Sequence, residues 1–205
     1  GKHMSPLNQY VVSFFHGKHE DGHEVASHID DFLESVPLLS RIVVSNRIIQ
    51  KRLKKWGVPE EKIVNIPIGV DTSLFLPPTK TQRLEARKSF GFNDDVIVIG
   101  SFQKDGIGWG EGLEPKLIKG PDVFLETIEI LHKDHSLAVL LTGPARGYVK
   151  DGLNKIGVSY VHVYVDEYKD LAKCYHSLDL YLVTSREEGG PMGLLESMAS
   201  GLPVV

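Results

Sequence analysis

The sequence has 205 residues, of which 41% are hydrophobic and 24% are charged, and its formal net charge is −4. These proportions are typical of a globular protein and exclude a mainly disordered chain, and the small negative charge gives no general attraction to nucleic acid or to an anionic membrane. The single cysteine, Cys174, cannot form a disulfide within the chain, which fits a reducing compartment such as the cytoplasm.

The first part of the chain alternates short apolar runs with helical patterns. Strands are expected at 10–15, 42–44 and 62–66. One helix is expected at 24–36. A second follows the middle strand, where Ser45 or Asn46 can cap its start and Gly57 marks its end. This alternation predicts an α/β arrangement.

Proline and glycine gather at 67–78, which we interpret as a linker between two domains. The domain before it is expected at 5–66 and the domain after it at 79–205. Residues 1–4 have the composition of a cloning remnant and are excluded from the fold argument. The last residues, 203–205, enter an apparent strand, so we expect the native protein to continue beyond them and also to begin earlier.

The second domain shows a cleaner alternation of strands and helices. Its strands are expected at 95–100, 137–142, 159–163, 179–183 and 203–205. Strands that alternate with helices form right-handed crossovers and a parallel sheet. The sequence therefore predicts a doubly wound, Rossmann-like domain, in which ligands bind outside the carboxyl ends of the strands.

Three loops that follow these strands, at 101–121, 143–147 and 185–191, are rich in glycine and lead into helices. The start of a helix favours anions because its backbone N–H groups lack intrahelical partners. Positive side chains accompany the loops, namely Lys104, Lys119 and Arg146. Each loop alone is equally consistent with an ordinary turn. Together the three predict a site for a phosphorylated ligand, and for a diphosphate in particular.

Two acidic residues, Glu188 and Glu196, flank the expected start of the last helix with seven residues between them. Carboxylates accept hydrogen bonds from sugar hydroxyls, so the pair suits a ligand that carries a sugar. An acid near a helix start can also serve only to stabilise that helix, by about 0.3–1 kcal/mol. The spacing alone leaves both interpretations open.

The segment 184–205, which contains both acids and ends Gly-Leu-Pro-Val-Val, resembles the donor-site signature of retaining glycosyltransferases of the GT-B fold, family 4. The segment 57–75 resembles the interdomain segment of that family, and Lys119-Gly120 resembles its phosphate-binding lysine. His16-Gly17 after the first strand resembles the histidine loop of the acceptor domain.

The resemblance implies two Rossmann-like domains with a sugar nucleotide, UDP- or GDP-linked, in the cleft between them. By the same resemblance, Glu188 and His16 contact the transferred sugar, Glu196 contacts the ribose, and Lys119 holds the diphosphate. The other implied donor-binding residues are Lys104, Gly143, Pro144, Arg146, Gly189, Gly190, Pro191, Met192 and Gly193.

The sequence departs from the family pattern at two places. Ser101 stands where the family usually has an arginine, and we expect Lys104 to supply that charge. Pro191 stands where the family often has glycine, which removes one backbone N–H that could bind the ligand.

No metal and no cofactor are expected. The sequence has no Asp-x-Asp pair of the kind that holds a divalent ion in other sugar transferases. His16, His19 and His23 are residue types that bind zinc, but their stretch has the composition of a flexible loop. Trp109, between two glycines, is equally suited to stack on a sugar or to close its own loop.

These observations predict a metal-independent, retaining glycosyltransferase that acts in polysaccharide or glycoconjugate synthesis. Its expected partners are a nucleotide-sugar donor and a saccharide or lipid-linked acceptor, with peripheral membrane contact through parts outside this chain and no nucleic acid. We expect the fragment alone to be inactive in transfer. The alternatives are a non-catalytic module that binds nucleotide sugars or phosphate, and another GT-B enzyme such as a sugar-nucleotide epimerase.

Overall fold

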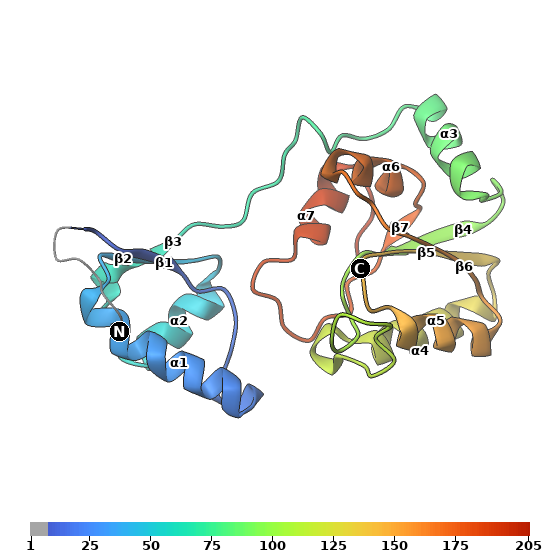
Figure 1. The fold of residues 1–205 in the computed structure, drawn as a ribbon. Helices are drawn as coiled ribbons and strands as arrows, with labels where there is room; N and C mark the ends of the chain where they lie inside the picture. Colours follow the sequence, from blue (N-terminus) through green and yellow to red (C-terminus); the bar gives the residue numbers. More distant parts are fainter. Residues whose placement is uncertain (1–7) are drawn as a thin grey trace. The chain divides into compact units, whose positions relative to one another are not determined.

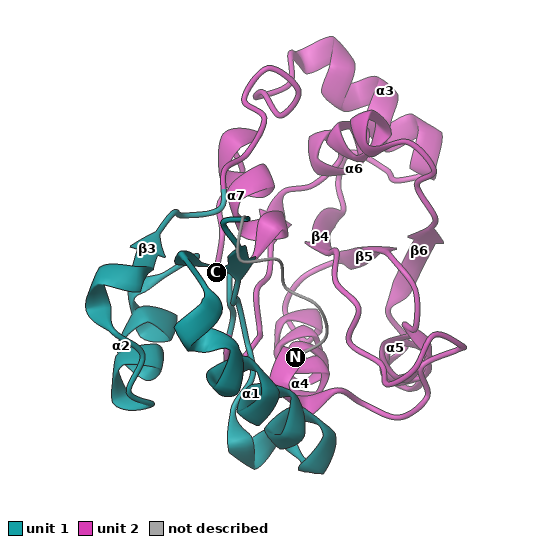
Figure 2. Cartoon of the chain, turned by 60° about the vertical axis from the view of Figure 1, so that its left-hand side comes forward, with its two compact units in different colours: residues 1–68, 188–190 teal, residues 69–187, 191–205 magenta. Residues whose placement is uncertain are grey.

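The computed structural model describes residues 8–205, so the expected cloning remnant lies outside the described residues. The chain divides into two compact units (Figure 2). Unit 1 comprises residues 1–68 and 188–190, and unit 2 comprises residues 69–187 and 191–205. Each unit contains its own parallel sheet and its own helices (Figure 1).

Unit 1 is built on a parallel sheet in the order β1-β2-β3. Its elements are β1 (Val11–Ser13), η1 (His19–Asp21), α1 (His23–Ser35), η2 (Val36–Leu38), β2 (Arg41–Val44), α2 (Arg47–Lys55), η3 (Glu60–Lys62) and β3 (Ile63–Asn65). Asn46, one of the two expected caps, begins α2 because its side chain accepts a hydrogen bond from the amide of Ile49 at 2.9 Å. The buried residues Ile42 and Val44 of β2 pack with Ile49 and Leu53 of α2 to form the centre of this unit.

Unit 2 is built on a parallel sheet in the order β6-β5-β4-β7. Its strands are β4 (Ile97–Ser101), β5 (Leu137–Thr142), β6 (Ser159–Val163) and β7 (Leu180–Tyr181). Its helices are α3 (Lys80–Phe90), η4 (Leu117–Lys119), α4 (Pro121–His132), α5 (Gly147–Ile156), η5 (Tyr168–Asp170), α6 (Leu171–His176) and α7 (Met192–Ala199).

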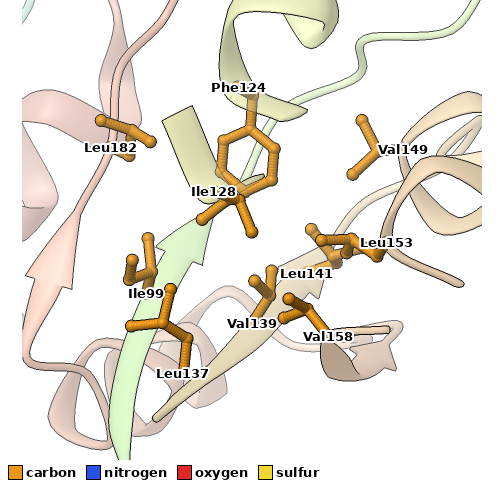
Figure 3. Close-up of a cluster of buried hydrophobic side chains, with 10 residues drawn as sticks. All are labelled: Ile99, Phe124, Ile128, Leu137, Val139, Leu141, Val149, Leu153, Val158 and Leu182. Carbon is orange, nitrogen blue, oxygen red and sulfur yellow. The ribbon is translucent and has the colours of Figure 1, made fainter. Parts of the chain in front are cut away.

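The sheet of unit 2 is covered on both faces, as a doubly wound fold requires. On one face, strand residues such as Val139 and Leu141 pack against Phe124 and Ile128 of α4 and against α5 (Figure 3). On the other face, Leu140 packs in a second cluster with α6 and other buried residues. The chain runs outward from β4 to β6 and then returns to the other side of β4. The strand order therefore reverses between β4 and β7.

Several expected elements differ in extent from those observed. The expected linker at 67–78 belongs to unit 2 from Gly69 onward, and Phe75 is fully buried there against Tyr175. The expected strand at 203–205 is a single parallel bridge between Val204 and Tyr181. The segment 188–190 groups with unit 1, although the sequence placed it in the second domain.

Gly120 joins η4 to α4 and has a φ of +63°, and a Cβ atom there would overlap the carbonyl oxygen of Thr184. We expect Gly120→Ala to lower the free energy of unfolding by about 3 kcal/mol, because it adds a steric clash to a left-handed backbone. Gly157 is the matched control, since its φ is +82° but a Cβ there meets nothing within 4 Å. Gly157→Ala should cost only about 1 kcal/mol. Urea denaturation measures both, and equal losses would contradict the packing argument.

Candidate functional site

The candidate site lies where the strand order of unit 2 reverses, at the carboxyl ends of β4 and β7. This is the place where open α/β sheets bind ligands. The loop after β4 leads to Lys119 and Gly120, and the loop after β7 leads to the start of α7. Sequence analysis predicted both loops as parts of the site.

Gln103 ties these two loops together. Its side-chain amide donates to the carbonyl oxygen of Lys119 at 3.0 Å, and its Oε1 accepts from the hydroxyl of Ser185 at 3.1 Å. The hydroxyl of Thr184 also donates to the carbonyl of Lys119, at 3.4 Å. Sequence reasoning missed these three polar residues, which fix the backbone that carries Lys119.

Arg186 provides a second connection between the same loops. Its guanidinium binds both carboxylate oxygens of Asp122 at 2.9 and 2.7 Å, and its amide donates to the carbonyl of Ile118 at 2.9 Å. The hydrogen bond from Arg186 lowers the pKa of Asp122 below its ordinary value. Because Asp122 lies in the first turn of α4, Arg186 fixes the loop after β7 against the helix that follows Lys119.

Arg146, for which a donor-binding role was expected, makes its contacts inside the protein. Arg146 is 1% exposed, and its guanidinium donates to the carbonyl of Ser101 at 2.6 Å and to that of Thr142 at 2.9 Å. Its Nε lies 2.9 Å from Oδ1 of Asp105, which is also buried. Burial raises the pKa of Asp105 above its ordinary value, against the attraction of the guanidinium. The guanidinium of Arg146 thus binds the ends of β4 and β5 and is not exposed to solvent.

Backbone N–H groups at the start of α5 are likewise paired with other backbone groups of the protein. The amides of Gly147 and Tyr148 donate to the carbonyl oxygens of Glu111 and Gly112 at 2.6 and 2.9 Å. These two N–H groups at the helix start are therefore already paired within the protein. The preceding Gly143 has a φ of +82°, and its carbonyl oxygen lies 2.7 Å from Nε2 of His162. Next to it, Pro144 is half-buried.

Lys104 contacts Trp109 within the loop after β4. The ammonium of Lys104 lies 3.7 Å from the centre of the indole ring, which is a cation–π contact, and Trp109 is 83% exposed. The tryptophan therefore closes its own loop through one face of its ring.

Helix α7 begins after Pro191 and brings Met192 and Gly193 to the site edge. A Cβ at Gly193 would overlap the hydroxyl of Tyr181, so glycine is required there by packing. Burial raises the pKa of Tyr181 to about 12, which keeps its hydroxyl protonated.

Glu196, one turn into α7, is 3% exposed and is held by two tyrosines. The hydroxyl of Tyr168 donates to its Oε1 at 2.6 Å, and the hydroxyl of Tyr175 donates to its Oε2 at 2.7 Å. Burial and the contact with this carboxylate raise the pKa of both tyrosines above the ordinary value. Sequence analysis singled out Glu196 but gave no sign of either partner.

Glu188, Gly189 and Gly190 lie with unit 1. There the carbonyl of Gly189 accepts hydrogen bonds from the hydroxyl of Ser45 and, at 3.0 Å, from the side-chain amide of Asn46. Side chains at these glycines are excluded, because a Cβ at Gly189 would overlap the carbonyl of Phe15 and one at Gly190 would overlap Ile68. The segment that carries Glu188 is therefore held through its backbone.

The histidine-rich stretch of unit 1 has no arrangement suited to a metal. His16 is exposed after β1, and Nε2 of His19 lies 3.0 Å from Oδ1 of Asp30 while its ring packs edge-on against Trp56. Within residues 8–205, no three His, Cys, Asp or Glu side chains gather so as to hold a metal ion. In the same range, none of the helices combines the length and apolar character needed to cross a membrane.

Residues 110–205 match the profile of the family described as "Glycosyl transferases group 1". This part of the chain is therefore similar to that family. The match covers Lys119, Glu188 and Glu196, and it includes the end of the loop after β4 and the whole loop after β7.

Two curated relatives illustrate the sequence similarity of this chain. The lipopolysaccharide core biosynthesis mannosyltransferase LpsB of Rhizobium meliloti (strain 1021) is 28% identical over 145 residues, which are 67% of this chain and 38% of the mannosyltransferase. A D-inositol 3-phosphate glycosyltransferase of Corynebacterium aurimucosum is 27% identical over 180 residues, 80% of this chain and 40% of that protein. The chain thus spans less than half the length of these relatives.

Solved structures show the fold. The crystal structure of Anabaena HepE in complex with UDP and glucose matches with a TM-score of 0.76 at 18% identity, over 96% of this chain and 52% of HepE. WaaG, a glycosyltransferase involved in lipopolysaccharide biosynthesis, matches with a TM-score of 0.68 at 16% identity, over 97% of this chain and 59% of WaaG. The expectation of a GT-B-like α/β fold is confirmed.

Proposed function

We propose that this chain binds the donor substrate of a glycosyltransferase that moves a sugar from a UDP- or GDP-linked donor to a hydroxyl group of a saccharide or lipid-linked acceptor. The observation that carries the proposal is the buried carboxylate of Glu196 at the reversal point of the sheet, within the residues that match the group 1 family. The relatives support it: one is named as a mannosyltransferase of lipopolysaccharide core synthesis, and the HepE structure contains UDP and glucose. We therefore propose a role in polysaccharide or glycoconjugate synthesis.

Each part of the donor has a proposed contact. Glu196 accepts hydrogen bonds from the ribose hydroxyls, and Lys119 pairs with the diphosphate. Glu188 and His16 contact the transferred sugar, as the family resemblance implies. Gly143 and Pro144, together with the Gly189–Gly193 segment, line the donor with backbone and small side chains.

The proposed reaction breaks the bond between the anomeric carbon of the sugar and a phosphate oxygen. Negative charge then develops on the departing diphosphate, and preorganised positive groups at that oxygen lower the barrier most. Lys119 and Lys104 supply such charge, and the amides of Met192 and Gly193 lack intrahelical acceptors because they begin α7. We propose that these groups suffice without a divalent metal and that the sugar is transferred with retention of configuration.

We also propose that the reaction takes place in the cytoplasm. Cys174 is compatible with a reducing compartment because it is buried, and burial raises the pKa of its thiol to about 12. Contact of the whole protein with a membrane surface would serve a lipid-linked acceptor.

A panel of sugar nucleotides tests the proposed function. We expect this chain to bind one of UDP and GDP in calorimetry, and the full-length protein to release the same nucleoside diphosphate from its sugar-linked form when an acceptor saccharide is present. Binding without release by the full-length protein would indicate a non-catalytic module. Conversion of one sugar nucleotide into another without an acceptor would indicate an epimerase.

The contribution of Lys119 can be measured separately. We expect Lys119→Ala to weaken binding of the nucleoside diphosphate by about 1.5–3 kcal/mol, the usual contribution of a hydrogen bond to a charged group. Binding of the bare nucleoside should hardly change, because it has no phosphate. Lys116→Ala, in the same loop and exposed, is the control and should leave both affinities intact. Equal weakening of both ligands by Lys119→Ala would mean that the lysine only supports the loop.

A further inference from the structure

The two tyrosines that hold Glu196 differ in how firmly they are fixed. Tyr175 is fully buried, and its ring packs against the rings of Phe75, Phe102 and Tyr181 at centroid distances of 5.7, 4.8 and 5.6 Å. Tyr168 is 50% exposed, and its ring has one aromatic contact, an edge-on approach to Phe75 at 5.3 Å. Tyr175 is therefore a fixed support, whereas Tyr168 lies between Glu196 and solvent.

Tyr168 also belongs to a short element. It begins η5, a three-residue helix in the connection between β6 and α6. Helices of this kind contain few internal hydrogen bonds, so a rearrangement of this turn costs less than one of the sheet. The hydrogen bond to Glu196 and the edge-on contact with Phe75 both hold the side chain in place.

We propose that Tyr168 is a gate on the nucleotide site: its hydroxyl occupies the carboxylate oxygen of Glu196 that a ribose hydroxyl takes, and it leaves when the nucleotide binds. The inference rests on the proposed function, because it assumes a ribose at Glu196. Glu196 is only 3% exposed, so a ribose can reach its carboxylate only after the side chains that cover it have moved.

Opening of the gate exchanges one hydrogen bond to Glu196 for another. A hydrogen bond from the phenol to the carboxylate is replaced by one from a ribose hydroxyl to the same oxygen, and the released phenol reaches water. A buried carboxylate stripped of donors is costly, so the gate keeps Glu196 satisfied in the absence of nucleotide. The closed state also lowers the apparent affinity, because only the fraction of molecules with an open gate binds.

Calorimetry with UDP and GDP on the intact chain tests the gate. We expect Tyr168→Phe, which loses only the competing hydroxyl, to bind the preferred nucleoside diphosphate about tenfold more tightly than the wild type, a factor equivalent to about 1.4 kcal/mol. Tyr175→Phe is the matched control, because it removes the bond to the other carboxylate oxygen without uncovering Glu196. It should give no gain in affinity and a lower melting temperature.

A second comparison separates competition from a general loosening of the loop. In a Glu196→Gln background the gain from Tyr168→Phe should shrink to less than threefold, because the charged acceptor for which both hydroxyls compete is gone. Unchanged or weaker binding by Tyr168→Phe, with wild-type binding intact, would overturn the gate and leave the proposed function standing. Failure of the wild type to bind either diphosphate would overturn both.

Discussion

Replacing Arg146 with methionine is expected to lower the free energy of unfolding of unit 2 by about 3–5 kcal/mol, because it leaves the Asp105 carboxylate buried without its partner. Both side chains are fully buried, and the guanidinium also holds Ser101 and Thr142 at the ends of β4 and β5. Urea denaturation of the intact chain, followed by far-ultraviolet circular dichroism, measures this loss.

The control for this prediction removes both charges at once. The double variant Asp105→Ala/Arg146→Met should be more stable than Arg146→Met alone, since no unpaired charge remains in the interior. If Arg146→Met costs less than about 1 kcal/mol, the guanidinium does not support these loops, and a ligand-facing role for it would return to consideration.

Substitutions of Glu188 and Glu196 are expected to affect the binding of different ligands. Glu196→Gln is expected to weaken binding of the sugar nucleotide and of the nucleoside diphosphate alike, because both carry the ribose. Glu188→Gln should leave diphosphate binding nearly unchanged. In the full-length enzyme it should lower kcat about 100-fold with little change in KM, as expected for a contact made mainly in the transition state.

A purely structural role predicts a different pattern. If the acids only stabilise the start of α7, each change costs up to about 1 kcal/mol of stability and neither discriminates between the ligands. Melting temperatures measured beside the affinities and rates distinguish the two cases. A lower melting temperature for Glu188→Gln with kcat intact would refute its contact with the reacting sugar.

The alternation of strands and helices was enough to predict the fold of unit 2. Residues 137–142 are an unbroken apolar run closed by threonine, and every residue of the resulting strand is buried. A strand buried on both faces has to be covered by helices on both sides, and helical patterns flank this run in the sequence. The location of the candidate site could be predicted from the same alternation. The order of the strands determines at which edge of the sheet the loops that follow them lie.

The partners of the charged residues could not be predicted in this way. Arg146 resembled an anion-binding residue because its loop is rich in glycine, but Asp105, 41 positions earlier, neutralises it. Tyr168 and Tyr175 reach Glu196 from a different connection of the sheet. Such contacts depend on how loops pack in three dimensions, and spacing along the chain carries no signal of them.

Calorimetry of the intact chain with UDP and GDP, on the wild type and on Glu196→Gln, tests the central claim most directly. The claim is that unit 2 binds a nucleoside diphosphate through the carboxylate of Glu196 at the reversal point of the sheet. We predict binding of one of the two diphosphates at a single site, and a loss of affinity of about tenfold or more in Glu196→Gln. Absence of binding to the wild type, or equal affinities for the two proteins, would contradict the claim.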